Sequence, residues 1–173
     1  MALHVAGPSA LWSGFTAKAE LLGAAVMRTA SEATAVGLLR ETANQFTCTA
    51  SAARRFPRIA EHATATAVDQ PAREVVAAGE FAVAETGSVA VNEARADRGL
   101  CFLAERLWLL VPEAEIVLNL DTAMLRMRDV VQAGAPHPLF MSGPSRTADI
   151  ERVLTVGVHG PRALVIVVIG QAA

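Results

Sequence analysis

The chain has 173 residues, of which 53% are hydrophobic and 18% are charged, and its net charge near neutral pH is −2. This length is typical of a single domain, here residues 1–173, that buries most of a core without disulfides or metal ions. The basic residues form no cluster and aromatic residues are few, so we do not expect the protein to bind nucleic acid.

The N-terminal region does not have the pattern of a signal peptide. It lacks a basic segment, and Gly7-Pro8 interrupts the stretch where an apolar signal core would lie. The longest uncharged apolar runs, residues 107–111 and 163–169, are far shorter than the roughly 20 residues of a membrane helix. We therefore expect a cytoplasmic protein without a membrane span.

The first third of the chain predicts helices that alternate with strands. Ser31, or Thr29 with Glu32 three residues later, is suited to begin a helix, because a side-chain oxygen at this position can accept a backbone hydrogen bond. The expected order is a helix over residues 15–22, a strand over 24–28, a helix from about residue 31, a strand over 45–49 and a helical turn that ends before Pro57.

Residues 81–91 predict a β-hairpin. Two apolar runs, 81–83 and 89–91, flank Glu85-Thr86-Gly87, whose glycine can adopt the positive φ of a tight loop. Glu85 at the tip is either an ordinary solvated turn residue or, if the tip turns into a ligand crevice, an acid–base candidate, because desolvation would raise its pKa. The sequence leaves both alternatives open.

The second half predicts further strands and one helix. The runs "LWLLV" and "EIVLNL" flank Pro112, and Asp121 or Thr122 is suited to begin a helix that ends at Gly134. Residues 139–141 predict a strand, and residues 163–169 a strand buried on both faces. This alternation favours an α/β fold with an open, largely parallel sheet, helices on both faces and an inserted β-hairpin.

The segment 142–161, "SGPSRTADIERVLTVGVHGP", is unusually polar for so apolar a chain. Ser145 or Thr147 is suited to cap a short helix whose buried face would be Ile150, Val153 and Leu154. The loop before that helix would lie at the carboxyl ends of the strands, where open α/β sheets usually bind ligands.

An anion site is one interpretation of this loop. Free amides at a helix N-terminus attract anions, and Arg146 adds a guanidinium that can anchor a carboxylate or a single phosphate. Asp149 and Glu151 compete for the same positive end of the helix. The alternative is that Asp149 pairs with Arg152 while Arg146 lies in solvent. His159 either bonds to backbone or binds a ligand and transfers protons.

Several classes of site are excluded by their missing motifs. We do not expect Ser145, Asp149 and His159 to form a hydrolase triad, because the serine lacks the G-x-S-x-G pattern of a nucleophile elbow and is suited to cap a helix. Cys48 and Cys101 are the only cysteines, so this chain cannot build a four-thiolate iron–sulfur cluster, and the scattered histidines predict no metal site. There is also no G-x-G-x-x-G or Walker A motif for a nucleotide cofactor.

Two stretches, "GEFAVAETGSVAV" at 79–91 and segment 142–161, strongly resemble the LUD-domain lactate-utilisation family, the LutC/YkgG group once catalogued as a domain of unknown function. The resemblance extends to an R-x-x-x-x-L segment at residues 98–103 and is strongest over 79–169. It implies a Rossmann-like fold of the NagB/RpiA/CoA-transferase type. It also implies a role in the bacterial oxidation of L-lactate to pyruvate, beside partner subunits that carry iron–sulfur clusters.

The resemblance also assigns functional positions. Relatives of the wider fold use a glutamate in a Glu-x-Gly loop as a nucleophile toward acyl groups, which makes Glu85 a candidate catalytic residue together with His159. The ligand-binding positions carried over are Thr86, Gly87, Ser142, Gly143, Ser145, Arg146, Thr147, Asp149, Glu151, Gly157 and Gly160.

Three functions follow from this assignment. The first is a LutC-like component that binds a small anion such as a 2-hydroxy or 2-oxo acid. The second is a stand-alone enzyme acting on an acyl-CoA or phosphosugar substrate, with Glu85 as base or nucleophile. The third is a noncatalytic assembly subunit whose apolar surface is covered by partners.

Overall fold

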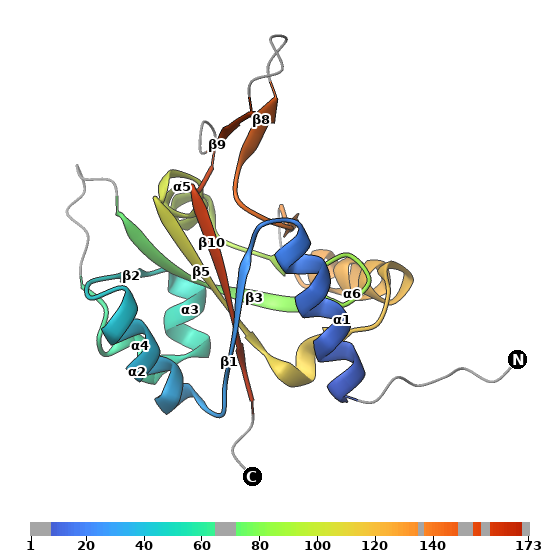
Figure 1. Cartoon of the computed structure of the whole chain (residues 1–173), viewed down its shortest axis with the longest axis horizontal. Coiled ribbons are helices and arrows are strands. Elements are labelled where there is room, and N and C mark those ends of the chain that lie inside the picture. The colour runs from blue at the N-terminus through green and yellow to red at the C-terminus, as the bar shows by residue number, and fades with distance from the viewer. Residues whose placement is uncertain (1–7, 65–71, 135–136, 149–153, 157–159, 171–173) are drawn as a thin grey trace, which may run out of the picture.

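The computed structural model describes residues 8–64, 72–134, 137–148, 154–156 and 160–170. A central sheet of eight strands carries helices on both faces (Figure 1). Its strands are β1 (Ala25–Thr29), β2 (Thr47–Cys48), β3 (Glu74–Val83), β4 (Ser88–Val91), β5 (Arg106–Pro112), β6 (Ile116–Val117), β7 (Leu139–Met141) and β10 (Ala163–Ile169). The helices are α1 (Pro8–Leu21), α2 (Glu32–Thr42), α3 (Ala50–Arg55), α4 (Pro57–Ala60), α5 (Arg95–Leu103) and α6 (Leu120–Gln132), with a 3₁₀ turn η1 (Glu113–Glu115).

The strand order is β1-β10-β5-β3-β4-β7, and β2 and β6 also pair with β3. Strands β1, β10, β5 and β3 are parallel, as are the β2 and β6 pairings, whereas β4 is antiparallel to both β3 and β7. The open, largely parallel sheet and the inserted hairpin predicted from the sequence are therefore confirmed. The parallel core is covered on both faces, which is why β5 and β10 are almost continuously apolar and buried.

Strand β3 is the long central element, and its two halves have different neighbours. Residues 74–78 lie between β5 and β2, whereas the second half lies between β4 and β6. A β-bulge between Gly79 and Phe81 separates the halves. The extra residue reverses the alternation, so Val75 and Ala77 share a face with Ala82 rather than with Phe81.

The core has three parts. Helices α1 and α5 cover one face of the sheet, and α2, α3 and α4 cover the other face over the parallel strands. On that second face, α6 covers the hairpin half through Ala123 and Met127, which pack with Phe81 and Val83. Both faces of β3 are therefore buried along most of its length. Its polar residue Glu80 lies at the bulge, where the neighbours of β3 change.

The ends of the helices differ in detail from those predicted. The first helix begins at Pro8 rather than Phe15, and α6 begins after Asn119, whose side chain accepts a hydrogen bond from the Thr122 amide at 3.0 Å, rather than at Asp121 or Thr122. Ser31 does begin α2, in a reciprocal capping pair with Thr34. Helix α5 was not predicted at all.

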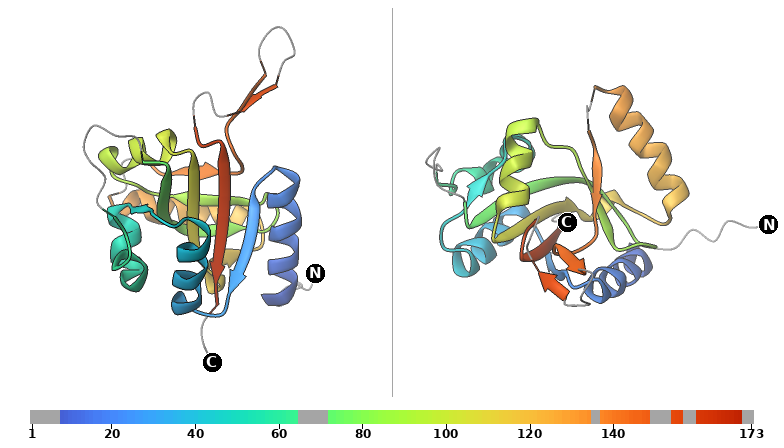
Figure 2. Two further views of the ribbon diagram at one scale, coloured as in Figure 1. Left: turned by 60° about the vertical axis from the view of Figure 1, so that its left-hand side comes forward. Right: turned by 90° about the horizontal axis from the view of Figure 1, so that it is seen from above.

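The short helix predicted after Ser145 or Thr147 is wrong. Residues 146–148 form strand β8 (Arg146–Ala148), which pairs antiparallel with β9 (Leu154–Val156) as a separate two-stranded sheet. Thr147 lies opposite Thr155 in this pair, and the β-branched residues Thr147, Thr155 and Val156 favour strands over helices. Figure 2 shows β8 and β9 projecting from the body of the fold.

Within the part of the chain that the structure describes, no helix is both long and apolar enough to cross a membrane.

Candidate functional site

Four of the predicted ligand-binding residues meet at the base of the projecting hairpin. Ser142, Gly143, Ser145 and Gly160 line a pocket of about 450 Å³, which we call the serine pocket. Its remaining walls are apolar and come from α5, β7 and the loop before the last strand: Phe102, Leu139, Phe140, Met141 and Pro161.

The serine pocket is formed by two passes of the chain in close contact. The Ser145 amide donates a hydrogen bond to the Pro161 carbonyl at 2.9 Å. A Cβ on Gly160 would lie 2.9 Å from the Ser145 Cβ, and a Cβ on Gly143 would lie 2.6 Å from the Leu22 carbonyl oxygen at the end of α1. Both glycines are therefore required by close approach, and they hold the polar wall of the pocket against the body of the fold.

The position of the serine pocket in the sheet differs from the prediction. Residues 142–145 do follow the carboxyl end of β7, but they lie beside Pro161 and Phe102, which precede β10 and β5. The pocket is thus at the amino ends of these two parallel strands rather than at their carboxyl ends. The β8–β9 hairpin brings residues 142–145 next to residues 160 and 161 at these amino ends. The sequence pattern did not predict this hairpin.

The remaining predicted residues of this segment are placed as follows. Arg146 and Thr147 lie in β8, directly after the pocket residue Ser145. Asp149, Glu151, Gly157 and His159 lie outside the described residues. Their predicted roles stay predictions.

The tip of the β3–β4 hairpin lies elsewhere. Glu85 is exposed, and its Oε2 accepts a hydrogen bond from the Leu120 amide at 2.8 Å, which satisfies a free N–H at the start of α6. Glu85 and Lys18 line a second pocket of about 420 Å³ between α1 and the start of α6. Glu85 is therefore exposed to solvent and also lines a pocket, and its catalytic role stays a prediction.

The other two tip residues secure the turn. The hydroxyls of Thr86 and Ser88 are hydrogen bonded to each other. Gly87 has φ of +65° and approaches α1 so closely that a Cβ would lie 2.4 Å from the Ala19 nitrogen. None of the three tip residues lines the serine pocket, so the structure does not unite the two predicted motifs in one site.

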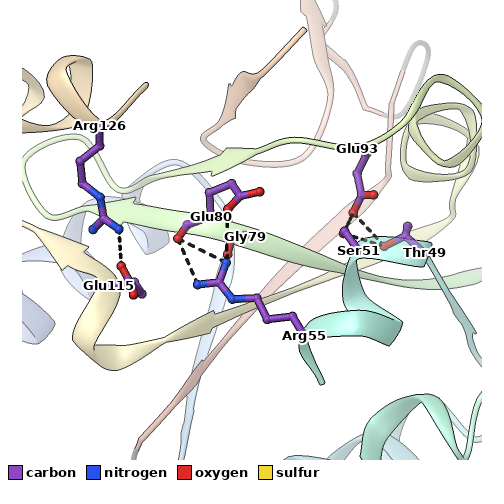
Figure 3. A network of polar contacts seen from close by, with 8 residues as sticks. All are labelled: Thr49, Ser51, Arg55, Gly79, Glu80, Glu93, Glu115 and Arg126. Carbon is purple, nitrogen blue, oxygen red and sulfur yellow. Dashed lines mark hydrogen bonds and ion pairs between the residues drawn. The ribbon is translucent and has the colours of Figure 1, made fainter. Parts of the chain in front are cut away.

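A buried carboxylate that the sequence analysis did not single out follows the end of β4 and lies beside Ala78 of β3. Glu93 is only 3% exposed, and its Oε1 accepts hydrogen bonds from the hydroxyls of Thr49, at 2.8 Å, and Ser51 (Figure 3). Its Oε2 is buried and accepts no hydrogen bond of normal geometry from the described residues. Such a half-satisfied carboxylate is costly, because burial penalises its charged form.

The electrostatic surroundings of Glu93 favour the protonated form. Burial raises the pKa of this carboxyl, and the nearby charge of Asp97 raises it further. The hydrogen bonds from Ser51 and Thr49 oppose this rise in pKa, as does the neighbouring Ala78 amide. The Asp97 carboxylate itself accepts a hydrogen bond from the Ala50 amide at 2.8 Å, at the start of α3.

The Arg55 guanidinium contacts the backbone at the bulge in β3. Arg55 donates to the Gly79 carbonyl at 2.7 Å and pairs with the Glu80 carboxylate at 3.5 Å (Figure 3). Glu93 lies where the carboxyl ends of β2 and β4 approach the same part of β3 from opposite directions. Its burial and its raised pKa make Glu93 a candidate proton-transfer group.

The cysteines have the properties of structural thiols. Cys101 is buried and Cys48 is half-buried, and burial raises the pKa of each thiol to about 12. A thiol with so high a pKa is a poor nucleophile. Among the described residues, no group of three His, Cys, Asp or Glu side chains could hold a metal ion.

The sequence of this chain is similar to that of a known protein family and of several of its members. The sequence model of the LUD domain matches residues 75–169. A protein named "Lactate utilization protein C" from Geobacillus thermodenitrificans is 33% identical over 98 residues, which is 54% of this chain and 41% of that protein. Its namesake from Deinococcus radiodurans is 38% identical over 96 residues, covering 51% of this chain and 42% of that protein.

Two further similarities concern an uncharacterised protein and a solved structure. The Escherichia coli protein named "Uncharacterized protein YkgG" is 32% identical over 104 residues, 58% of this chain and 45% of that protein. The crystal structure of a duf162 family protein from Deinococcus radiodurans matches with a TM-score of 0.68 and 21% identity, covering 95% of this chain and 99% of that one, which shows the fold. The chain spans about two-fifths of the length of the curated relatives it matches.

Proposed function

The chain belongs to the LUD domain family, and from this premise we propose that it is a LutC-like component of a bacterial L-lactate utilisation system that binds a small anionic ligand. Relatives that carry the name "Lactate utilization protein C" support the association with lactate. We propose that the ligand is a 2-hydroxy or 2-oxo acid, since lactate and pyruvate are the smallest members of these classes.

The observation that carries the proposal is the meeting of Ser142, Gly143, Ser145 and Gly160 around one pocket. These residues come from two chain segments that contact each other through the Ser145 amide. Two serine hydroxyls in a partly apolar pocket are suitable donors to a carboxylate. The volume of about 450 Å³ lies within the usual range of ligand pockets, about 300–1,000 Å³.

Arg98 is a suitable cation for this ligand. It is half-buried on α5 and lies four residues before the pocket residue Phe102, hence on the same helix face. Within the described ranges it forms no ion pair, and a guanidinium without a carboxylate is free to bind an anion. The other half-buried arginines that the structure describes each lie near a glutamate: Arg55, Arg106 and Arg126.

We also propose partner subunits that carry iron–sulfur clusters. Oxidation of lactate to pyruvate releases two electrons, which require an acceptor. This chain has two cysteines, whereas a four-thiolate cluster needs twice as many. The exposed apolar side chains Leu21, Leu22 and Leu103 offer surface for such partners near the ends of α1 and α5.

The test combines binding with genetics. Calorimetry of the full chain with L-lactate and with pyruvate should show binding that is lost in the Ser142→Ala/Ser145→Ala double variant. Glu85→Gln, which alters the separate second pocket, should leave the Kd unchanged. Deletion of the gene should slow growth on L-lactate as the carbon source. If neither acid binds and growth is unaffected, the proposed function is wrong.

A second candidate function is acid–base catalysis, and a specific observation favours Glu93 as its residue. Glu93 is buried with a raised pKa, whereas the exposed Glu85 carboxylate already serves the start of α6. Turnover of acetyl-CoA or of a pentose 5-phosphate that is abolished by Glu93→Gln and retained in Glu85→Gln would support it. If the wild-type chain turns over neither substrate, this candidate fails.

A further inference from the structure

The serine pocket is larger and more apolar than lactate requires. A pocket volume of about 450 Å³ is in the range that binds drug-sized ligands, whereas lactate has only six heavy atoms. Five of the nine lining residues are apolar and belong to the α5, β7 and Pro161 side of the pocket. A ligand that filled only the polar side would leave most of this apolar wall in contact with water.

The apolar wall is fixed in place before any ligand binds. Phe140 packs edge-on against Phe81, with ring centroids 6.1 Å apart and an interplanar angle of 76°. Met141 is buried, and it pairs in register with Val89 of β4. A wall of this kind does not collapse onto a small ligand, so its shape selects the ligand.

Phe102 lines the apolar side of the pocket and is partly exposed to water. It is 38% exposed, although an aromatic ring gains more by burial than most side chains. It belongs to the last turn of α5, next to Leu103, which is 72% exposed and does not line the pocket. An apolar group of the ligand that covered Phe102 would remove this ring from water.

We propose that the serine pocket selects 2-hydroxy or 2-oxo acids whose side chain is longer than the methyl group of lactate, an inference that rests on the proposed function. The carboxylate lies on the side of Ser142 and Ser145, and the apolar side chain lies against Phe102 and Met141. The specificity of the site therefore comes from α5 and β7, and its anion binding from the loop.

The expected preference follows from the area that each methylene removes from water. Burial of one CH₂ group tightens binding by about fourfold. The acid 2-hydroxy-4-methylpentanoate has three carbons more than lactate, so its Kd should be lower by a factor on the order of 50.

The experiment titrates the full chain by calorimetry with L-lactate, 2-hydroxybutanoate and 2-hydroxy-4-methylpentanoate. Phe102→Ala should reduce the ratio of the lactate Kd to the longest acid's Kd several-fold, because the apolar contact is lost. Leu103→Ala is the matched control on the same helical turn and should leave the ratio unchanged. Ser145→Ala should weaken all three acids by a similar factor.

The outcomes separate the two proposals. Equal Kd values for the three acids would overturn the inference and leave the proposed function in place. An equal effect of Phe102→Ala and Leu103→Ala on the ratio would also overturn the inference. Absence of binding by every acid would overturn the proposed function, and the inference with it.

Discussion

The hairpin tip offers a quantitative test of how the fold is held together, through Gly87→Ala. Gly87 has φ of +65°, and an added Cβ would lie 2.4 Å from the Ala19 nitrogen and 2.6 Å from the Lys18 carbonyl carbon. The left-handed conformation costs a residue with a Cβ about 1–2 kcal/mol. The clash is with helix backbone, which cannot move alone, and such overpacking adds about 1–3 kcal/mol. We expect the variant to be destabilised by about 2–5 kcal/mol.

Two other glycines serve as matched controls for Gly87. Gly134 has φ of +97° but no atom within 4 Å of an added Cβ, so Gly134→Ala pays only the backbone cost. Gly99 lies within α5 with open space around it, so Gly99→Ala should stabilise the protein by about 0.5–1 kcal/mol. The difference between Gly87→Ala and Gly134→Ala therefore measures the packing of the tip on α1.

Urea unfolding followed by circular dichroism measures these changes, and thermal melts should agree, at about 2–4 °C per kcal/mol for a chain of this size. If Gly87→Ala costs no more than Gly134→Ala, the close contact between the hairpin tip and α1 does not exist in solution.

Three further predictions concern titratable groups and the ligand. Because the pKa of Glu93 is raised in the folded state, its own contribution to the free energy of unfolding should be largest below the unfolded pKa of about 4.3 and should be lost as pH rises through the folded pKa. The difference in free energy of unfolding between wild type and Glu93→Gln should therefore change over this pH range, and a difference independent of pH would contradict the raised pKa. Cys101, with a pKa of about 12, should react with Ellman's reagent at pH 8 only at the rate of unfolding, so rapid labelling of the native protein would refute its burial. Arg98→Ala should weaken binding of 2-hydroxy acids at least tenfold, whereas the exposed Arg54→Ala should not, and equal Kd values would remove Arg98 from the site.

The parts of the fold that the sequence predicted are those with a strong local pattern. The run 163–169 is β-branched and apolar throughout, and it is the buried strand β10. The alternation on either side of Glu85-Thr86-Gly87 has the period of two that a hairpin requires, and the pairing of β3 with β4 confirms it. In both cases the residues that decide the structure are neighbours in sequence.

The wrong helix after Ser145 shows the limit of local reasoning. Ser145 and Thr147 fit a cap, and Ile150, Val153 and Leu154 fit a helical face, so two helix signals agreed. The pairing of Thr147 with Thr155 spans eight residues, and β-branched residues at both positions favour it. Capping and spacing are weak preferences, and the contact between strands outweighs them.

The serine pocket and Glu93 also differ in how far apart in sequence their residues lie. Four of the residues predicted to bind a ligand line the serine pocket together because residues 142–145 and 160 belong to one short segment that closes on itself. Glu93, by contrast, gains its burial from Thr49 and Ser51, which are 44 and 42 residues away in sequence. The sequence around Asn92-Glu93 does not indicate that the hydroxyls of Thr49 and Ser51 lie next to this carboxylate. From sequence alone, Glu93 is therefore expected to be a surface residue.

The bulge in β3 connects the two candidate sites. Arg55 holds the Gly79 and Glu80 carbonyls on one side of the bulge, next to the α3 residues that bind Glu93. On the other side, the reversed alternation turns Phe81 toward α6 and Phe140, so that Phe81 supports a wall of the serine pocket. If β3 alternated regularly through the same residues, Phe81 would share the face of Val75 and Ala77, which α1 covers, and Phe140 would lose its aromatic partner. The same irregularity in one strand therefore positions Phe81 behind the apolar wall that we assign to ligand selection.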